Sequence, residues 1–347
     1  MYHILIISAI IAVVAGTGMA QTTPTLTFQV DGTSRSCVVH VPDGIEKPAV
    51  VFFLHGAGGN GPGFANDTKG NTTADREKFI AVYPSGVGGN WDYNSDGSND
   101  FKFMFALIDT LDARYQVDRD RLYVAGFSMG GGMCFALGCR YSEVFAAIAP
   151  VSAAGSACTP DRKIPVLLTF GTKDMYPPAN YMTSLERWAA FDGCTADPEI
   201  TSPYPADNSQ SVVTRISYGP CDEGTYVVAD SVHNGGHGWP TDARTSVNQA
   251  DEVWAFCSQF SLKGSTAVDR RVPVSGNTAI TATYVQGTIC ITGAGERCRV
   301  KVIDCRGRMV ASAAGTSRIA VDGNPGGVYL VIVNGMTGTV VQRVVVP

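Results

Sequence analysis

The segment that most limits the possible folds of this chain is Gly126-Phe127-Ser128-Met129-Gly130. It follows Arg121–Ala125, a β-branched and aromatic run typical of a buried strand, and it precedes Gly131–Leu137, which has a helical pattern. A strand, the sequence G-x-S-x-G and a helix, in that order, are typical of a nucleophile elbow, whose strained turn lifts a serine hydroxyl above the edge of a sheet. The alternative is an ordinary Gly-Ser turn, because the chain has 39 glycines. The flanking strand and helix favour Ser128 as a nucleophile.

Strand-like and helical patterns alternate through residues 49–260, which predicts an α/β fold with a mostly parallel sheet and helices on both faces. A hairpin over residues 24–42 is expected to precede it. The other expected strands are Ala49–Leu54, Phe79–Pro84, Ala146–Val151, Ile164–Phe170, Val212–Ser217 and Thr225–Val232. The other expected helices are Phe101–Tyr115, Tyr181–Phe191 and Asp242–Lys263.

Two further residues fit the order nucleophile, acid, histidine that this strand–turn–helix motif predicts. Asp174 follows a buried strand, so it is expected at the same sheet edge as Ser128; Asp197, Asp207 and Asp230 are weaker candidates. His237 lies in a glycine-rich loop from which an imidazole can reach the serine. His233 closes the preceding strand and is expected to be structural.

The loop that begins at His55 is rich in glycine and has two interpretations. A phosphate-binding loop would continue with G-K-[ST], which is missing here. In a hydrolase the same loop supplies a main-chain donor to an oxyanion, and we expect the amides of Ala57 and Met129 to form that oxyanion hole. His55 itself is expected to hold the loop rather than move protons.

Four aromatic residues are candidates for substrate binding; the alternative is ordinary packing for Trp91 and Tyr93 and a cap on the histidine loop for Trp239. The four residues are Trp91, Tyr93, Tyr176 and Trp239. The segment after Trp91 has the spacing of the start of a calcium loop at Asp92, Asn94 and Asp96, but Phe103 stands where the bidentate glutamate belongs. We therefore expect a solvated turn there and no metal site.

Composition points to an exported protein without a nucleic-acid partner. The net charge is −5, and no basic cluster is present. Residues 1–20 have the apolar run and small residues of a signal peptide, and no later segment is apolar enough to span a membrane. Ten cysteines fit an oxidising compartment. Seven precede residue 260 and three follow it, so one thiol is expected to remain in each part unless a disulfide joins the two parts.

The pattern changes after Gly264, where helical periodicity ends and short β runs begin. The expected domains are a hydrolase domain at 21–263, a linker at 264–274 and a small antiparallel β-sandwich at 275–347.

Four blocks of the sequence resemble, in order, those of secreted α/β-hydrolases related to feruloyl esterases, acetylxylan esterases and polyhydroxybutyrate depolymerases. The blocks are Leu54–Gly59, Gly126–Met133, Phe170–Asp174 and Gly235–Pro240. The resemblance covers about residues 25–260 and implies the α/β-hydrolase fold, with Ser128, Asp174 and His237 as nucleophile, orienting acid and base. Phe170 stands where many of these relatives have His, which implies different packing around Asp174.

The same resemblance implies two disulfides, because such relatives often pair cysteines at positions like Cys139 with Cys158 and Cys194 with Cys221. The tail, at Val302–Arg308 and Gly327–Val331, is similar to the C-terminal sorting domain of type IX secretion substrates. That similarity implies the secretion machinery as a partner, for export or surface attachment.

Together these features predict a secreted serine esterase of plant cell-wall polysaccharide that needs no cofactor. Release of ferulate or related hydroxycinnamates from arabinoxylan is the first expectation, since the four aromatic residues could enclose a phenolic ring. Acetylated xylan is the second expected substrate and polyhydroxybutyrate the third. A non-catalytic carbohydrate-binding protein is the alternative from another class.

Overall fold

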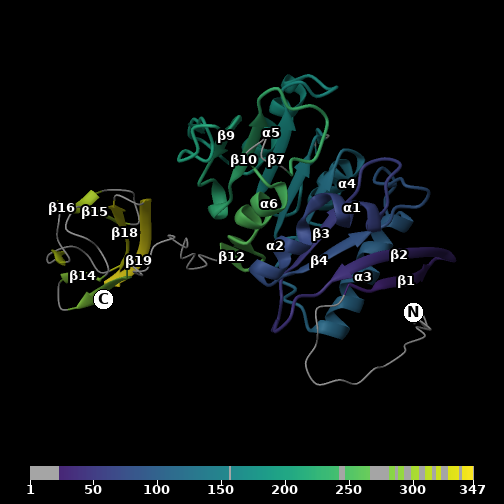
Figure 1. Ribbon diagram of the computed structural model, residues 1–347, viewed down its shortest axis with the longest axis horizontal. Coiled ribbons are helices and arrows are strands. Elements are labelled where there is room, and N and C mark those ends of the chain that lie inside the picture. The colour runs from purple at the N-terminus through teal and green to yellow at the C-terminus, as the bar shows by residue number, and fades with distance from the viewer. Residues whose placement is uncertain are drawn as a thin grey trace. The chain divides into compact units, whose positions relative to one another are not determined.

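A computed structural model of the 347-residue chain divides into two compact units, residues 1–266 and 267–347 (Figure 1). It describes residues 23–155, 158–241 and 247–265, and in the second unit 281–285, 288–292, 298–304, 309–314, 318–321, 327–335 and 338–346. The predicted signal peptide and residues 266–274 of the predicted linker lie outside the described residues.

The first unit is built on one ten-stranded sheet with the order β1-β2-β4-β3-β5-β6-β7-β10-β9-β8. The six central strands, from β4 to β10 in that order, are parallel, and an antiparallel pair flanks them at each edge. The strands are β1 Thr25–Val30, β2 Thr33–His40, β3 Val50–Leu54, β4 Ile80–Pro84, β5 Leu122–Phe127, β6 Ala147–Val151, β7 Val166–Gly171, β8 Glu199–Thr201, β9 Val213–Tyr218 and β10 Val227–Val232. β3, β4, β6 and β7 are buried at every position, as their continuous apolar sequences require.

Helices cover both faces of this sheet. Residues of α3 (Asn99–Tyr115), α4 (Met129–Arg140) and α5 (Pro178–Phe191) belong to one apolar core, and residues of α1 (Gly61–Thr68), α2 (Gly70–Glu77) and α6 (Gln249–Cys257) belong to the core on the other face. This is the α/β architecture that the alternating patterns predict.

The closing helix differs from the expected Asp242–Lys263. It begins after Asn248, whose side chain caps the helix by accepting from the N–H of Ala250 (3.2 Å), and it ends at Cys257. Two short strands follow, β11 Phe260–Ser261 and β12 Gly264–Ser265. Residues 242–246 lie outside the described residues.

The second unit is an all-β structure in its described residues. A three-stranded sheet contains β13 Thr281–Val285, β14 Thr288–Thr292 and β17 Arg318–Ala320, and a four-stranded sheet contains β15 Arg299–Asp304, β16 Met309–Ala314, β18 Gly327–Gly335 and β19 Gly338–Val346. Every pairing is antiparallel. Side chains of both sheets share one apolar core, as in a sandwich.

The cysteines differ in part from expectation. Cys139 is bonded to Cys158 and Cys194 to Cys221. Three buried thiols remain in the first unit instead of one, at Cys37, Cys134 and Cys257. The third is in the core on the opposite side of the sheet from the other two, so the sheet prevents its pairing with them.

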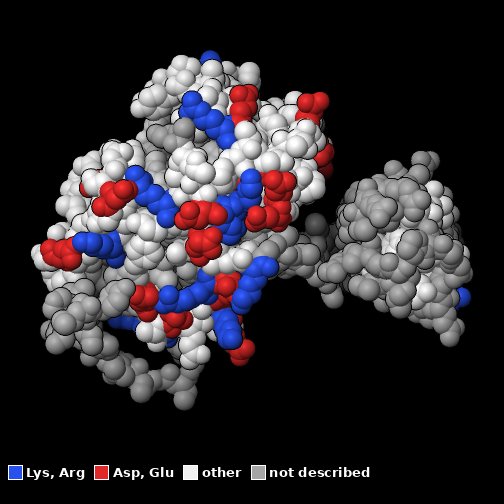
Figure 2. All heavy atoms as spheres, turned by 180° about the vertical axis from the view of Figure 1, so that it is seen from behind, with Lys and Arg blue, Asp and Glu red and all other residues white. Residues whose placement is uncertain are grey.

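On the face shown in Figure 2, basic and acidic side chains of the first unit lie intermixed. The ion pairs of the first unit include those of Arg119 with Asp109 and Asp112. Within the described ranges, no helix has both the length and the apolar character needed to cross a membrane.

Candidate active site

The nucleophile elbow forms as the sequence predicts, with Ser128 between β5 and α4. Ser128 has φ 53°, a left-handed conformation that strains a residue with a side chain. The turn closes only because its flanking glycines lack side chains: a Cβ on Gly126 would lie 2.2 Å from the carbonyl oxygen of Gly130, and one on Gly130 would lie 2.2 Å from that of Leu54. The strain therefore raises the Ser128 hydroxyl at the carboxyl edge of the sheet.

A histidine and a carboxylate line up behind this hydroxyl. Nε2 of His237 lies 2.8 Å from Oγ of Ser128, and Nδ1 of His237 lies 3.0 Å from both carboxylate oxygens of Asp174. With Nδ1 donating to the carboxylate, Nε2 is left to accept the serine proton. The structure thus brings together the three residues selected from the sequence, whereas Asp230 pairs with Arg215 and His233 is exposed.

The Asp174 carboxylate is held in its ionised form. Burial favours the neutral acid, but hydrogen bonds from the Tyr176 main chain (3.1 Å) and from His237 outweigh it and hold the pKa of Asp174 below its ordinary value of 3.8. Tyr181 lies beside the carboxylate, and its ring stacks on Phe170 at a centroid distance of 4.8 Å. Phe170 therefore packs against the tyrosine that lies next to the Asp174 carboxylate.

The acid turn and the histidine loop are joined through their main chains. The N–H of Thr172 donates to the carbonyl of Val232 (2.9 Å), and the N–H of Lys173 donates to that of Gly235 (2.8 Å). The N–H of Asn234 donates to the Thr172 hydroxyl (2.8 Å). These bonds fix the two loops relative to each other across the ends of β7 and β10.

The loop after β3 lies on the other side of Ser128. A Cβ on Gly56 would lie 3.4 Å from Cβ of Ser128, so this loop reaches the nucleophile. Among the hydrogen bonds of the described residues, none uses the N–H of Ala57 or of Met129. This lack of a partner is what the predicted oxyanion hole requires, and the oxyanion role of the two amides stays a prediction.

His55 holds this loop in place, as expected. Its Nδ1 donates to the Gly56 carbonyl (2.7 Å), and its Nε2 accepts from the N–H of Gly86 (2.9 Å). Burial lowers the pKa of His55, which keeps the ring neutral and in the tautomer that these two bonds require.

The prediction that Trp91 contacts substrate is wrong. Its side chain is 4 % exposed, its Nε1 donates to the His55 carbonyl (2.8 Å), and its ring lies against the His55 ring at 4.8 Å. Trp91 supports the loop after β3, because packing on His55 covers the ring that a substrate would need.

The other three aromatic residues differ in their surroundings. Trp239 contacts Phe53 and Phe64 edge to face, so it caps the histidine loop against the apolar core. Tyr93 is half-buried over Gly132, whose hypothetical Cβ would lie 2.8 Å from the tyrosine ring. Tyr176 is 50 % exposed and lies beside His237.

Sequence reasoning missed Ser152, which directly follows β6. It is 1 % exposed, has φ 50°, and its hydroxyl lies 3.4 Å from the carbonyl oxygen of Gly238 in the histidine loop. The hydroxyl also helps to lower the pKa of Asp174. A buried serine in a left-handed conformation is a feature of strained functional sites, but the sequence Val-Ser after a strand gives no sign of it.

The segment that imitates a calcium loop forms an Asx turn. Oδ1 of Asp92 accepts from the N–H groups of Asn94 (3.3 Å) and Ser95 (3.2 Å). In the parts of the chain that the structure describes, no group of three or more His, Cys, Asp or Glu side chains is arranged to hold a metal ion.

The sheet order, the elbow and the position of the site at the carboxyl edge of the parallel strands define an α/β-hydrolase fold. Residues 36–158 match the family model described as Esterase PHB depolymerase.

The chain is similar to known carbohydrate esterases. It is 28 % identical over 252 residues to the bifunctional acetylxylan esterase/xylanase XynS20E of Neocallimastix patriciarum, covering 71 % of this chain and 35 % of that protein. It is 30 % identical over 188 residues to feruloyl esterase B of Piromyces equi, covering 48 % of this chain and 32 % of that protein. The chain thus spans about a third of the length of these relatives. The solved acetyl xylan esterase from Aspergillus awamori superposes with a TM-score of 0.55 at 19 % identity, covering 68 % of this chain and 99 % of that one, and shows the common fold.

Proposed function

We propose that this protein is a serine esterase that cleaves esters on plant cell-wall polysaccharide. The observation that carries this proposal is the hydrogen-bonded series from Ser128 through His237 to Asp174. The main-chain amides of Ala57 and Met129, which have no partner among the described hydrogen bonds, are the donors that we propose for the oxyanion. The relatives named above support a polysaccharide ester as the substrate.

The arrangement suits acyl transfer through a covalent intermediate. His237 takes the proton of Ser128 as its oxygen attacks the ester carbonyl, and the amides of Ala57 and Met129 stabilise the oxyanion. His237 then donates this proton to the leaving alcohol, while Asp174 stabilises the imidazolium. Water, activated by the same histidine, attacks the acyl-serine and releases the acid.

For the acyl group we propose ferulate first, in line with the similarity to feruloyl esterase B. Acetate is the second candidate, because the burial of Trp91 removes one of the aromatic rings that were predicted to enclose a phenol. The similarity to XynS20E, which is described as an acetylxylan esterase/xylanase, also favours acetate.

We also propose that the protein acts outside the cell, which its two disulfides support. Export or surface attachment is the role that we propose for the second unit, with the secretion machinery as its partner.

The first test is covalent labelling by a fluorophosphonate, which reacts with activated serines. Wild-type protein should be labelled and Ser128→Ala should not. If the folded wild-type protein resists labelling, it is not a serine esterase, and a carbohydrate-binding protein that keeps the hydrolase shape becomes the better explanation.

The second test identifies the ester. Product release is measured from feruloylated arabinoxylan, acetylated xylan and methyl ferulate in parallel, with Ser128→Ala as the control. Ferulate that is released by the wild type and not by the variant would support a feruloyl esterase, and acetate alone would indicate an acetylxylan esterase.

A further inference from the structure

We infer that Tyr176, with Met175 beside it, forms the subsite for the alcohol half of the ester, which in the proposed reaction is the sugar. This assignment of a subsite rests on the proposed function, and it differs from the expected contact of Tyr176 with a phenolic acyl group.

The order of strands fixes which loops lie on which side of the nucleophile. β3, β5, β6, β7 and β10 are parallel neighbours, so the loops that follow them occur in the same order along one sheet edge. The loop with Ala57 follows β3, Ser128 follows β5, Asp174 and Tyr176 follow β7, and His237 follows β10. The oxyanion donor of the β3 loop and the acid–base pair therefore lie on opposite sides of Ser128.

The chemistry assigns one part of the ester to each side. The carbonyl oxygen must point to the amides that stabilise its charge. The oxygen of the leaving alcohol must come within hydrogen-bond reach of Nε2 of His237, because that atom supplies its proton. The alcohol therefore occupies the side on which the loops after β7 and β10 lie.

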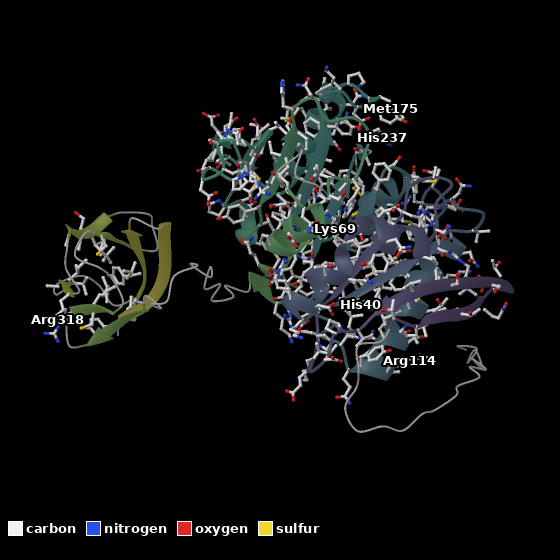
Figure 3. All side chains as sticks on the ribbon, viewed as in Figure 1. His40, Lys69, Arg114, Met175, His237 and Arg318 are labelled. Atoms are coloured by element: carbon white, nitrogen blue, oxygen red, sulfur yellow. A yellow bond between two sulfur atoms is a disulfide. The ribbon has the colours of Figure 1, made fainter. Side chains whose placement is uncertain are left out.

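Tyr176 and Met175 present apolar surface on this side. The Tyr176 ring centroid is 6.2 Å from that of His237, with an angle of 68° between the ring planes. Tyr176 is 50 % exposed and Met175 is 70 % exposed. Figure 3 shows Met175 and His237 at the same end of the first unit. Exposed large apolar side chains beside a site favour ligand binding, and a tyrosine face suits the C–H face of a sugar ring.

The turn that carries Tyr176 is anchored to the catalytic acid. The main-chain N–H of Tyr176 donates to Oδ1 of Asp174 (3.1 Å), and the N–H of Lys173 donates to the Gly235 carbonyl (2.8 Å). The main chain that carries the exposed ring is thus held at a fixed place relative to His237, as a subsite requires.

Tyr93 is on the opposite side. It follows β4, which lies beyond β3 in the sheet, and its ring rests on Gly132 of α4. The two tyrosines therefore lie on different sides of the nucleophile. This arrangement does not support a phenolic ring of the substrate held between Tyr93 and Tyr176.

The test compares two esters that share an acyl group and differ in the alcohol, methyl ferulate and 5-O-feruloyl-arabinofuranose. The measured quantity is the ratio of their kcat/KM values. In Tyr176→Ala this selectivity for the sugar ester should fall about tenfold, the loss expected when one aromatic contact is removed. Tyr176→Phe should keep most of the selectivity, because it keeps the ring face. Ile200→Ala is the matched control, since it truncates an exposed apolar side chain on β8, at the edge of the sheet.

An equal loss on both esters in Tyr176→Ala would overturn the assignment, because it would place the ring on the acyl side or give it a structural role. A wild-type enzyme that fluorophosphonate labels but that cleaves neither ferulate ester would contradict only the proposal of ferulate as the acyl group. The alcohol subsite is then tested with methyl and benzyl butyrate, and an unchanged ratio of their kcat/KM values in Tyr176→Ala would overturn it.

Discussion

Replacement of Asp192 by Asn is expected to stabilise the first unit at neutral pH. Asp192 ends α5 and is fully buried. Its Oδ1 accepts from the N–H of Ile164 (3.3 Å). The Thr225 hydroxyl also lies near the carboxylate and opposes the rise of its pKa, but it donates to the carbonyl oxygen of Asp222 (3.0 Å), which leaves Oδ2 without a donor among the described residues. Burial raises the pKa of Asp192 from 3.8 to about 6, in spite of the nearby charges of Lys163 and Arg162.

The direction of the effect follows from proton linkage. Between pH 3.8 and about 6 the folded state keeps a proton that the unfolded state has lost, so the free energy of unfolding falls as the pH rises through this window. A shift of about two units at about 1.4 kcal/mol each gives a maximum of about 3 kcal/mol. Because Asn does not ionise, Asp192→Asn should match the wild type near pH 4 and exceed its stability by about 2 to 3 kcal/mol at pH 8.

Urea unfolding followed by tryptophan fluorescence at several pH values measures this difference. All four tryptophans, at positions 91, 188, 239 and 254, precede residue 266, so the signal reports the first unit alone. Asp161→Asn, at an exposed site, is the control for loss of one negative charge. A stability difference that stays constant between pH 4 and pH 8, or a less stable Asp192→Asn at pH 8, would refute the reasoning.

Three further predictions concern the site and the core. Asp174→Asn should lower kcat about 10³- to 10⁴-fold with little change in KM, because the amide no longer favours the required His237 tautomer; an effect under tenfold would contradict its role. Ser152→Ala and Ser152→Gly should both lower kcat/KM several-fold through loss of the hydroxyl. Because glycine tolerates the positive φ of this position, the free energy of unfolding of the Gly variant should exceed that of the Ala variant by about 1 kcal/mol. Equal stabilities would contradict the assigned strain. Burial raises the pKa of Cys37 to about 12 and also raises those of Cys134 and Cys257, so iodoacetamide at pH 8 should modify these thiols only after unfolding; rapid modification of the native protein, seen by mass spectrometry, would show that the core opens.

The elements that could be predicted from the sequence are those in which one local pattern dominates. Continuous apolar runs such as Val50–Leu54 have few alternatives to a buried parallel strand. Ser128, Asp174 and His237 could be selected because each follows a strand of the parallel sheet, and the structure places all three within hydrogen-bonding contact.

The elements that were missed depend on contacts far away in the sequence. α1 and α2 have the sequences GPGFANDT and GNTTADRE, which are poor helix formers. Asn60 caps α1 locally by accepting from the N–H of Gly63 (2.8 Å), but the helix is held by Phe64, whose ring packs edge to face on Trp239 much later in the chain.

Side-chain exposure was equally hard to predict. A tryptophan in a polar loop resembles a substrate contact in the sequence, and only the tertiary fold shows that Trp91 packs on His55. The role of Ser152 depends on its left-handed backbone and on a contact with Gly238, 86 positions later, neither of which a short sequence window contains.

The main-chain bonds between the turn after β7 and the loop after β10 have a thermodynamic consequence. Because the acid and the base belong to one hydrogen-bonded unit, their alignment is established during folding, and no binding energy is needed to assemble them when an ester arrives. The energy gained from contacts with the substrate therefore remains available to lower the barrier of the chemical step. The amide protons of Thr172 and Lys173 sit within this unit, so their exchange with solvent deuterium would directly measure how often the catalytic pair comes apart.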